Sequence, residues 1–506
     1  MNTNTEKYKE HNQIEHNNEH ARLDDQDVTE KNNSSFREKI CNVYKNITIE
    51  PCLFLVMTAS TLHTMASQNL NLEKACRVNL NFSTEICDSL IQQDGEAHSD
   101  YERETQQLIA NTLVWKTYLT ATMICILALF VGSFSDKTGY RKLFLILPIT
   151  GYLLGGINSI IQVYFFYETT LEMLVLSGAI IDGLTGGYCI LFMICFAYIS
   201  DITTNEDRTF RVSVLAFSVL LASPFGWVLS GVLLNALGYY GVNGIFLLLN
   251  AVAIIYTIFV INDPKKSPEQ QKYKGASWCK LLRTFFNISN LKNALKIIIR
   301  KAPNSRRLRL CILLLMVLVL YGSVYGESSI MYLFTRYRFQ WDEVQYSFFQ
   351  SFNLFTNLIG TALAILIFVK YLGMHDSLLG IISVLTKIVA LFVYCFAQTG
   401  LVFYLGPIID TINGMSMVAV RSIMSKLVEA HEIGKLSSLI GIVENLSPLM
   451  YMPLYAKVYS ATMDVLPGAV FLVGGLLMVP ALAVLCYLFY EHKKQVGQSQ
   501  SNESQL

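Results

Sequence analysis

Repeated apolar segments, each long enough to cross a lipid bilayer, constrain this chain more than any other feature. A membrane-spanning helix needs about 20 mainly apolar residues. Twelve such segments are present. The composition of the whole chain agrees with this, since 53% of the 506 residues are hydrophobic and only 15% are charged. They are 51–70, 111–135, 143–164, 171–200, 210–237, 242–261, 310–334, 344–369, 378–396, 401–428, 436–460 and 467–490. The sequence therefore predicts an all-α membrane protein with twelve transmembrane helices.

A polar stretch divides the twelve segments into two sets of six. Residues 263–309 contain thirteen Lys or Arg and two acidic residues, and a loop of this kind stays on the cytosolic side. We therefore expect both chain termini to be cytosolic. The predicted parts are a disordered cytosolic tail at 1–50, a six-helix bundle at 51–262, a basic cytosolic linker at 263–309, a second six-helix bundle at 310–490 and a cytosolic tail at 491–506.

The loop after the first segment has the features of an extracytosolic loop. It contains Cys76 and Cys87, whereas most of the other cysteines lie in apolar segments. The sequon Asn81-Phe82-Ser83 lies between the two cysteines. Disulfides and N-linked glycans form on that side of the membrane, so we expect a Cys76–Cys87 disulfide and a glycan on Asn81.

The loop between the second and third segments carries the strongest local motif. It reads Gly132-Ser133-Phe134-Ser135-Asp136-Lys137-Thr138-Gly139-Tyr140-Arg141-Lys142. Asp136 is placed to accept backbone N–H groups at a helix N-terminus, Gly139 permits a tight turn, and the basic pair can bridge to nearby acids. An ordinary cytosolic loop explains the basic residues but not their spacing with the glycines. With Asp201 and Arg208, which follow the fourth segment, these residues form a predicted gate network.

This motif resembles the G-x-x-x-D-x-x-G-x-R-K signature of the major facilitator superfamily. The stretches Arg421-Ser422-Ile423-Met424-Ser425-Lys426-Leu427-Val428 and Glu444-Asn445-Leu446-Ser447-Pro448 are similar to solute-carrier family 46, the group that contains the proton-coupled folate transporter. The resemblance implies a carrier for organic anions, coupled to protons in the folate-transporting member. Arg421 falls on an arginine of that member, but Ala216 stands where its proton-coupling glutamate is expected.

Charged residues inside the segments are the remaining functional candidates. Each costs about 2.5–3.5 kcal/mol in mid-membrane on an insertion scale, so it faces the bundle interior or a cavity. Gln350 and Asn353 add a polar stripe on one helix face. Interhelical contacts, such as an Arg421–Glu444 pair, explain these residues as well as a transport path does. The candidates for a substrate or proton path are Glu327, Gln350, Asn353, Arg421 and Glu444.

The sequence thus predicts a secondary transporter that moves a small organic anion by alternating access, with protons as the candidate coupling ion. Its predicted partners are the lipid bilayer and the solute, in the plasma membrane rather than the lysosomal membrane. A net charge of +1 gives no reason to expect nucleic acid. Without a nucleophile, metal or phosphate motif, we expect no enzyme activity, no metal and no cofactor. A drug/proton antiporter, or a non-transporting receptor or scaffold, is the alternative.

Overall fold

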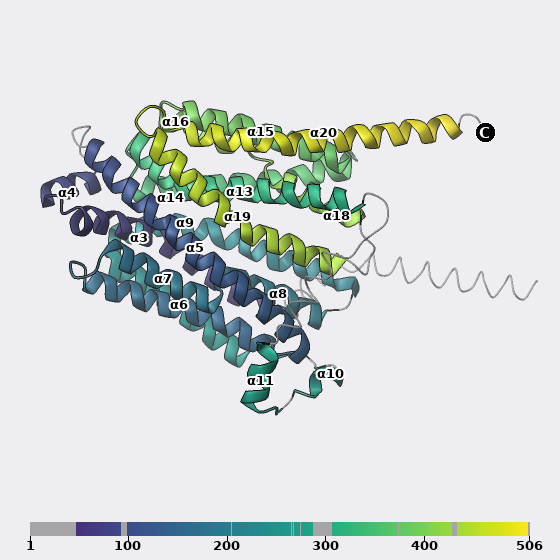
Figure 1. The fold of residues 1–506 in the computed structure, drawn as a ribbon, viewed down its shortest axis with the longest axis horizontal. Coiled ribbons are helices and arrows are strands. Elements are labelled where there is room, and N and C mark those ends of the chain that lie inside the picture. The colour runs from purple at the N-terminus through teal and green to yellow at the C-terminus, as the bar shows by residue number, and fades with distance from the viewer. Residues whose placement is uncertain are drawn as a thin grey trace, which may run out of the picture. The chain divides into compact units, whose positions relative to one another are not determined.

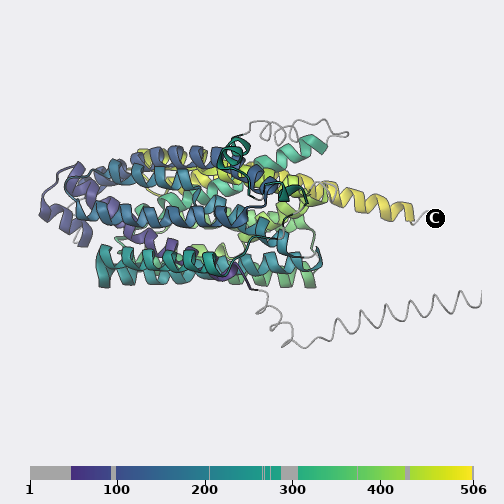
Figure 2. The same cartoon turned by 90° about the horizontal axis from the view of Figure 1, so that it is seen from below.

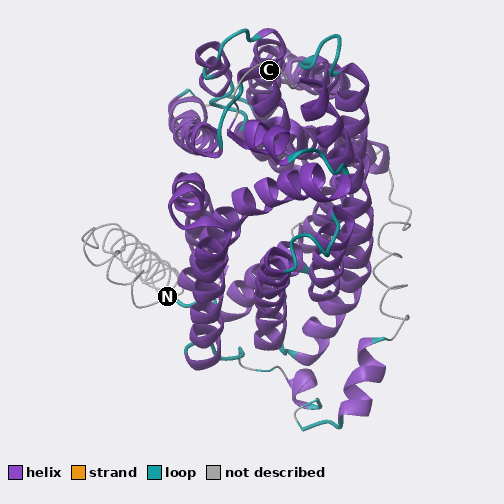
Figure 3. Cartoon of the chain, turned by 90° about the vertical axis from the view of Figure 1, so that its left-hand side faces the viewer, coloured by secondary structure: helices purple, strands orange, loops and turns teal. Residues whose placement is uncertain are grey.

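The computed structural model describes residues 47–92, 99–203, 205–264, 266, 268–273, 275–286, 306–372, 374–427 and 433–503. Within these ranges the regular structure is entirely helical, with no β-strand (Figure 3). The chain divides into two compact units, residues 1–51 and 52–506. All the sites below lie in the second unit.

The helices before the linker form the N-half. α6 packs against α7, α8 and α9, and α5 packs against α7 and α8. The elements are α3 (Glu50–Lys74), the π-helix η1 (Ala75–Asn79), α4 (Thr84–Gln92), α5 (Ser99–Thr138), α6 (Arg141–Tyr164), α7 (Leu171–Thr185), α8 (Gly187–Ile202) and α9 (Asn205–Phe259). The linker adds the short helices α10 (Pro268–Gln271) and α11 (Trp278–Phe285).

The helices after the linker form the C-half. α13 packs against α18, α19 and α20, while α15 packs against α17, α18 and α20. The elements are α13 (Arg306–Phe339), α14 (Glu343–Ala364), the π-helix η3 (Ile365–Tyr371), α15 (Asp376–Phe396), α16 (Gly400–Phe403), α17 (Leu405–Ile409), α18 (Gly414–Lys426), α19 (Ile433–Thr462) and α20 (Ala469–Glu503). The two halves meet where α5 packs on α19 and α9 packs on α14 (Figures 1 and 2).

Every apolar segment identified in the sequence is helical over most of its length, which confirms the predicted fold class. In the described residues, nine helical stretches are long and apolar enough to cross a membrane. One of them, Val214–Phe259, covers most of the predicted segments 210–237 and 242–261, which are joined through Gly238. The φ of +64° at Gly238 is a conformation that glycine adopts at little cost. α3 and α19 cover the first and eleventh predicted segments.

Large apolar side chains cover the outside of these helices. Trp115 is 68% exposed, Phe259 is 79% exposed and Leu476 is 70% exposed. In water such side chains would form an aggregation-prone surface, whereas hydrocarbon solvates them. The helical backbone satisfies its own hydrogen bonds, as the lipid environment requires. The exposed apolar surface and the helical backbone both fit a multi-pass membrane protein.

Two helices are broken at corresponding positions of the two halves. α7 and α8 are separated at Gly186, whose φ is +86°. In the C-half, a turn at 410–413 separates α17 from α18. Thr411 in this turn follows Gly186 by about 225 residues, close to the 230 residues between the starts of the predicted segments 171–200 and 401–428, as parallel repeats would give. Interrupted helices at equivalent places are a feature of transporter binding sites, because they present backbone polar groups at membrane depth.

Candidate functional site

A cavity of about 540 Å³ lies between helices of both halves. The N-half supplies its walls from α3, α5, α6, α7, α8 and α9, and the C-half supplies them from α13 and α19. Its polar lining includes Ser60, His63, Thr64, Ser67, Gln68, Asn71, Lys116, Thr117, Thr120, Asn158, Ser159, Asp182, Ser328 and Ser329. The cavity therefore occupies the interface of the repeats, where transporters of this architecture bind solutes.

Lys116, Asp182 and His63 are the ionisable groups of this lining apart from tyrosines and a cysteine. Lys116 interacts electrostatically with both Asp182 and His63. In the described part of the chain, no salt bridge is formed by Lys116 or by Asp182. His63 stacks on the Phe246 ring with centroids 4.5 Å apart. An ammonium group thus faces a cavity without being neutralised by direct pairing.

Aromatic rings form much of the apolar wall of the cavity. Tyr152 and Phe246 contribute from the N-half, and Tyr332 contributes from the C-half. Tyr188 of α8 and Tyr325 of α13 interact across the two halves. Aromatic surface combined with polar side chains and a lysine suits an amphipathic organic anion, because the rings cover the apolar body while the polar groups fix its orientation.

Hydrogen bonds and ion pairs join the halves near the end of the bundle that carries the first loop, which we call the disulfide end. Arg336 of α13 is only 3% exposed, and its Nε lies 3.1 Å from Oε1 of Glu102 on α5. The Arg336 guanidinium also donates to the carbonyl of Leu90. Gln106 accepts a hydrogen bond from the Tyr459 hydroxyl at 3.0 Å. These contacts join the two halves at the disulfide end.

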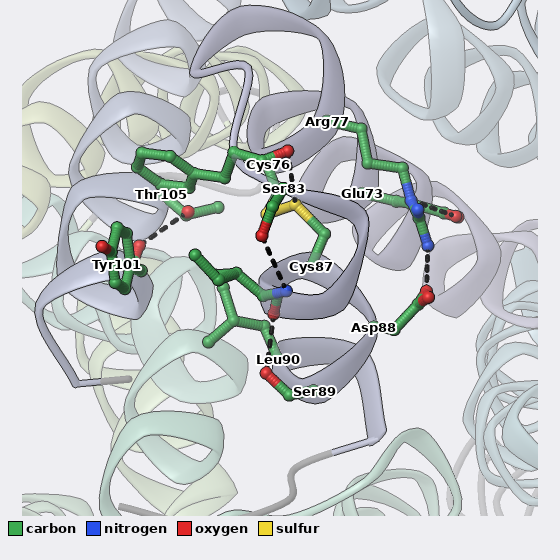
Figure 4. Close-up of a disulfide and its surroundings, with 12 residues drawn as sticks. Glu73, Cys76, Arg77, Ser83, Cys87, Asp88, Ser89, Leu90, Tyr101 and Thr105 are labelled. Carbon is green, nitrogen blue, oxygen red and sulfur yellow. Dashed lines mark hydrogen bonds and ion pairs between the residues drawn. A yellow bond between two sulfur atoms is a disulfide. The ribbon is translucent and has the colours of Figure 1, made fainter. Parts of the chain in front are cut away.

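A disulfide between Cys76 and Cys87 holds the first loop together (Figure 4). Arg77 pairs with Glu73 at 3.1 Å and also with Asp88, which fastens α4 to the end of α3. The predicted disulfide is therefore present in the structure. Asn81 is exposed in this loop with a φ of +52°, so its side chain is accessible, and its glycosylation stays a prediction.

The gate motif is assembled at the opposite end of the bundle, which we call the linker end. Arg141 Nη1 lies 2.8 Å from Asp136, and Arg141 Nε lies 2.8 Å from Asp201 of α8. Gly139 makes the turn into α6 with a φ of +71°. Lys142 donates to the Ile258 carbonyl. The motif thus connects the ends of α5, α6, α8 and α9.

The linker supplies a contact to this motif that sequence reasoning missed. Asp263 accepts hydrogen bonds from the backbone N–H groups of Arg141 and Lys142, at 3.0 and 2.8 Å. These N–H groups lie at the start of α6, where the helix itself offers them no partner and a carboxylate is favourable. The sequence motif predicts such a role for Asp136. Gly132 lies on α5 near Met193, while the side chain of Arg208 lies outside the described part of the structure.

The predicted path residues of the C-half lie outside the lining of the cavity. Glu327 lies 2.7 Å from Lys387, which is also 2.8 Å from Asp410. Arg421 pairs with Glu444. On α14, Asn353 accepts a hydrogen bond from the Asn357 amide, and Gln350 Oε1 is buried without a hydrogen-bond partner among the described residues. Their roles in transport stay predictions.

Lys116 is the cavity residue that sequence analysis passed over. It lies five residues inside the predicted span 111–135. A lysine at such a place is costly in lipid and is by default a functional candidate. The signal was therefore available in the sequence. The proximity of Lys116 to Asp182 cannot be predicted from the sequence. The two residues are 66 positions apart, and their approach depends on how α5 packs against α7.

Taken together, two helical halves around a polar cavity define a membrane transporter. The Major Facilitator Superfamily profile matches residues 104–452. The chain belongs to this superfamily, and secondary transport of a small solute rather than enzyme catalysis is its function.

Curated relatives confirm the resemblance to solute-carrier family 46. The lysosomal proton-coupled steroid conjugate and bile acid symporter SLC46A3 of mouse is 28% identical over 366 residues, 70% of this chain and 74% of the relative. The chicken protein of the same name is 25% identical over 458 residues, 88% of this chain and 94% of the relative. The rat proton-coupled folate transporter is 26% identical over 359 residues, 70% and 73% of the two chains.

Solved structures share the fold. The human organic anion transporter MFSD10 (TETRAN) aligns with a TM-score of 0.57 and 16% identity, over 86% of this chain and 97% of that one. The inward-open xylose transporter XylE of E. coli aligns with a TM-score of 0.56 and 14% identity, over 87% and 95% of the two chains. At these identities the likeness concerns the fold alone.

Proposed function

We propose that this transporter moves an organic anion with a large apolar body, of the bile acid or conjugated steroid kind, through the cavity between its halves. The observation that carries the proposal is the position of Lys116, a cation facing an aromatic-lined cavity with no salt bridge in the described part of the chain. The named substrates of the SLC46A3 relatives combine an apolar frame with an anionic group. Folate, the substrate named for another relative, is the second candidate.

The mechanism we propose is alternating access coupled to protons. In this proposal the disulfide end is the closed end of the present conformation, and the contacts of Arg336 with Glu102 and with the Leu90 carbonyl support it. The SLC46A3 relatives are named as proton-coupled symporters, and the rat relative is named as a proton-coupled folate transporter. At the linker end, Asp136, Arg141 and Asp201 form the gate network in this proposal, because their ion pairs join helix ends that move apart when a half rotates. Gly132, Gly139, Lys142 and Arg208 belong to the same network.

The proposed orientation places the linker and both termini in the cytosol. The disulfide and the Asn81 sequon occur at one end of the bundle, and the thirteen-charge linker follows α9 at the other. Positive charge on the cytosolic side and disulfides on the other side support this orientation. The plasma membrane stays the predicted location, with the lysosomal membrane of the SLC46A3 relatives as the alternative.

We expect protease added outside sealed, right-side-out vesicles to leave the linker intact and to cut it after detergent lysis. A glycosidase shift that disappears in Asn81→Gln is expected from the same preparation. Efficient cleavage of the linker without lysis would contradict the orientation. Immunofluorescence of the full chain against a lysosomal marker distinguishes the two membranes.

We expect Lys116→Gln to weaken taurocholate binding to the purified protein by roughly tenfold, the equivalent of about 1.4 kcal/mol. The reason is the loss of the cation that attracts the sulfonate. The neutral methyl ester of cholate should bind the variant and the wild type equally. Lys457→Gln is the matched control, because Lys457 is exposed on α19 and does not line the cavity. Equal loss for the charged and the neutral ligand would reject the role of Lys116.

A further inference from the structure

A second group of ionisable side chains is buried in the C-half, away from the lining of the cavity. Lys387 of α15 lies 2.7 Å from Glu327 of α13 and 2.8 Å from Asp410, which follows α17. All three residues are 5% exposed or less. We call these three residues the acid–lysine cluster. The cluster connects α13 and α15 to the turn at 410–413, which separates α17 from α18.

The cluster is unbalanced in charge. Two carboxylates and one ammonium leave a net charge of −1 when all three groups are ionised. No further basic side chain forms a salt bridge with either carboxylate in the described part of the chain. Burying a net charge in a low-dielectric interior is much more costly than burying a neutral set. Binding one proton removes the imbalance, so the cluster is built to hold a proton.

The surroundings of the cluster identify the carboxyl that takes the proton. Asp410 Oδ2 accepts from Lys387, whereas Oδ1 is buried with neither a hydrogen-bond partner nor an ion pair among the described residues. Glu327 Oε2 also lacks a hydrogen-bond partner there, but it lies 2.7 Å from the Lys387 ammonium. The other titratable groups that face the cluster are tyrosines, which are neutral at physiological pH. They are Tyr346 of α14, Tyr394 of α15 and Tyr455 of α19. A bare, buried carboxylate oxygen is the expected place for a proton.

Helix α15, which carries Lys387, also forms hydrogen bonds to the turn between α17 and α18. Ser383 Oγ, one turn before Lys387, lies 2.9 Å from the carbonyls of Ile412 and Asn413 and accepts from Ser416 N–H at 3.0 Å. Asp410 begins this turn. Protonation of Asp410 weakens its attraction to Lys387, so it changes how firmly α15 is tied to the break between α17 and α18.

We propose that the acid–lysine cluster is the proton-binding site of the transporter, with Asp410 as the carrier, Lys387 as its counter-charge and Glu327 as the second acid. The proposal rests on the proposed function and locates its coupling site in the C-half, separate from the solute cavity. In the proton-loaded state Asp410 is neutral and Lys387 pairs with Glu327. Release of the proton leaves Asp410 ionised and paired with Lys387. No other bond forms or breaks, and the proton moves from one compartment to the other with the conformational change.

Two measurements on the full-length protein test this proposal. Infrared difference spectra after a pH step, recorded without solute, should show a protonated-carboxyl band that is lost in Asp410→Asn. In proteoliposomes, Asp410→Asn and Glu327→Gln should lose pH-gradient-driven accumulation of taurocholate by about tenfold or more, while exchange of internal for external taurocholate persists, because exchange needs no net proton movement. Glu85→Gln, an exposed residue of α4, is the control.

The outcomes separate the two proposals. A carboxyl band that survives in both Asp410→Asn and Glu327→Gln overturns the cluster as the proton site, whatever the solute. A wild-type protein that shows the band but does not transport taurocholate contradicts the proposed solute class and leaves the proton site supported. If the single variants fail to fold, the variant Glu327→Gln/Lys387→Met/Asp410→Asn removes all three charges together. Gradient-driven accumulation by that folded variant would overturn the cluster.

Discussion

We expect Arg336→Gln to open the disulfide end of the transporter. Arg336 is 3% exposed and pairs with Glu102, which is 9% exposed. Removing one partner of a buried ion pair costs about 3–5 kcal/mol, because the other charge stays buried alone. The pair joins the two halves, so the cost falls on the state that is closed at this end. The equilibrium between states should therefore shift by roughly 10²- to 10⁴-fold toward opening.

The shift can be measured with a cysteine on the cavity wall. Ser328→Cys places a thiol on the lining of the cavity, and a membrane-impermeant maleimide added at the disulfide end should label it much faster when Arg336→Gln is also present. Arg338→Gln is the matched control, since Arg338 is an exposed arginine two residues along the same helix. Equal labelling rates in the two variants would show that the pair does not seal the cavity.

The helices could be predicted from the sequence because a lipid environment leaves few alternatives. An apolar run of the right length forms a helix in a bilayer, since its backbone has no other way to satisfy its hydrogen bonds. The interruptions were harder to predict. Gly186 and Gly238 lie inside apolar stretches that also contain glycines in ordinary helical conformation, such as Gly183 and Gly244. Composition does not reveal which glycine adopts a positive φ, because the surrounding packing decides it.

The partners of the charged residues in ion pairs and hydrogen bonds are likewise decided by how the helices pack. The sequence predicts that Glu327 faces the bundle interior or a cavity, but it does not indicate that Lys387 lies between Glu327 and Asp410. An Arg421–Glu444 pair can be proposed from the sequence because adjacent predicted spans carry these opposite charges. The role of Asp263 cannot be predicted from the sequence, because this residue lies just beyond an apolar segment, at the start of the basic linker. Only the packing of α9 on α6 brings Asp263 to the N-terminus of α6.

The second large effect that we predict concerns Arg421, for which binding of the solute and structural pairing with Glu444 can be tested separately. Its Nη2 donates to the Tyr321 hydroxyl at 3.0 Å and pairs with Glu444. The Arg421 side chain is nevertheless 52% exposed, so donors of its guanidinium remain accessible to a passing solute. A guanidinium offers five donors in a fixed fork that matches carboxylate or sulfonate geometry, and lysine does not reproduce that fork.

We expect Arg421→Lys to fold and to reach the membrane, but to lose roughly 10- to 100-fold in apparent affinity for taurocholate, as for a lost charge-assisted hydrogen bond of about 1.5–3 kcal/mol. Binding of the neutral methyl ester of cholate should change much less, because it lacks the anionic group. A purely structural role predicts a different pattern. Arg421→Gln would then lower folded abundance, and adding Glu444→Gln would restore both abundance and transport, because the unpaired carboxylate is gone. Full recovery in that double variant, or equal losses for both ligands, would leave Arg421 as a structural partner of Glu444.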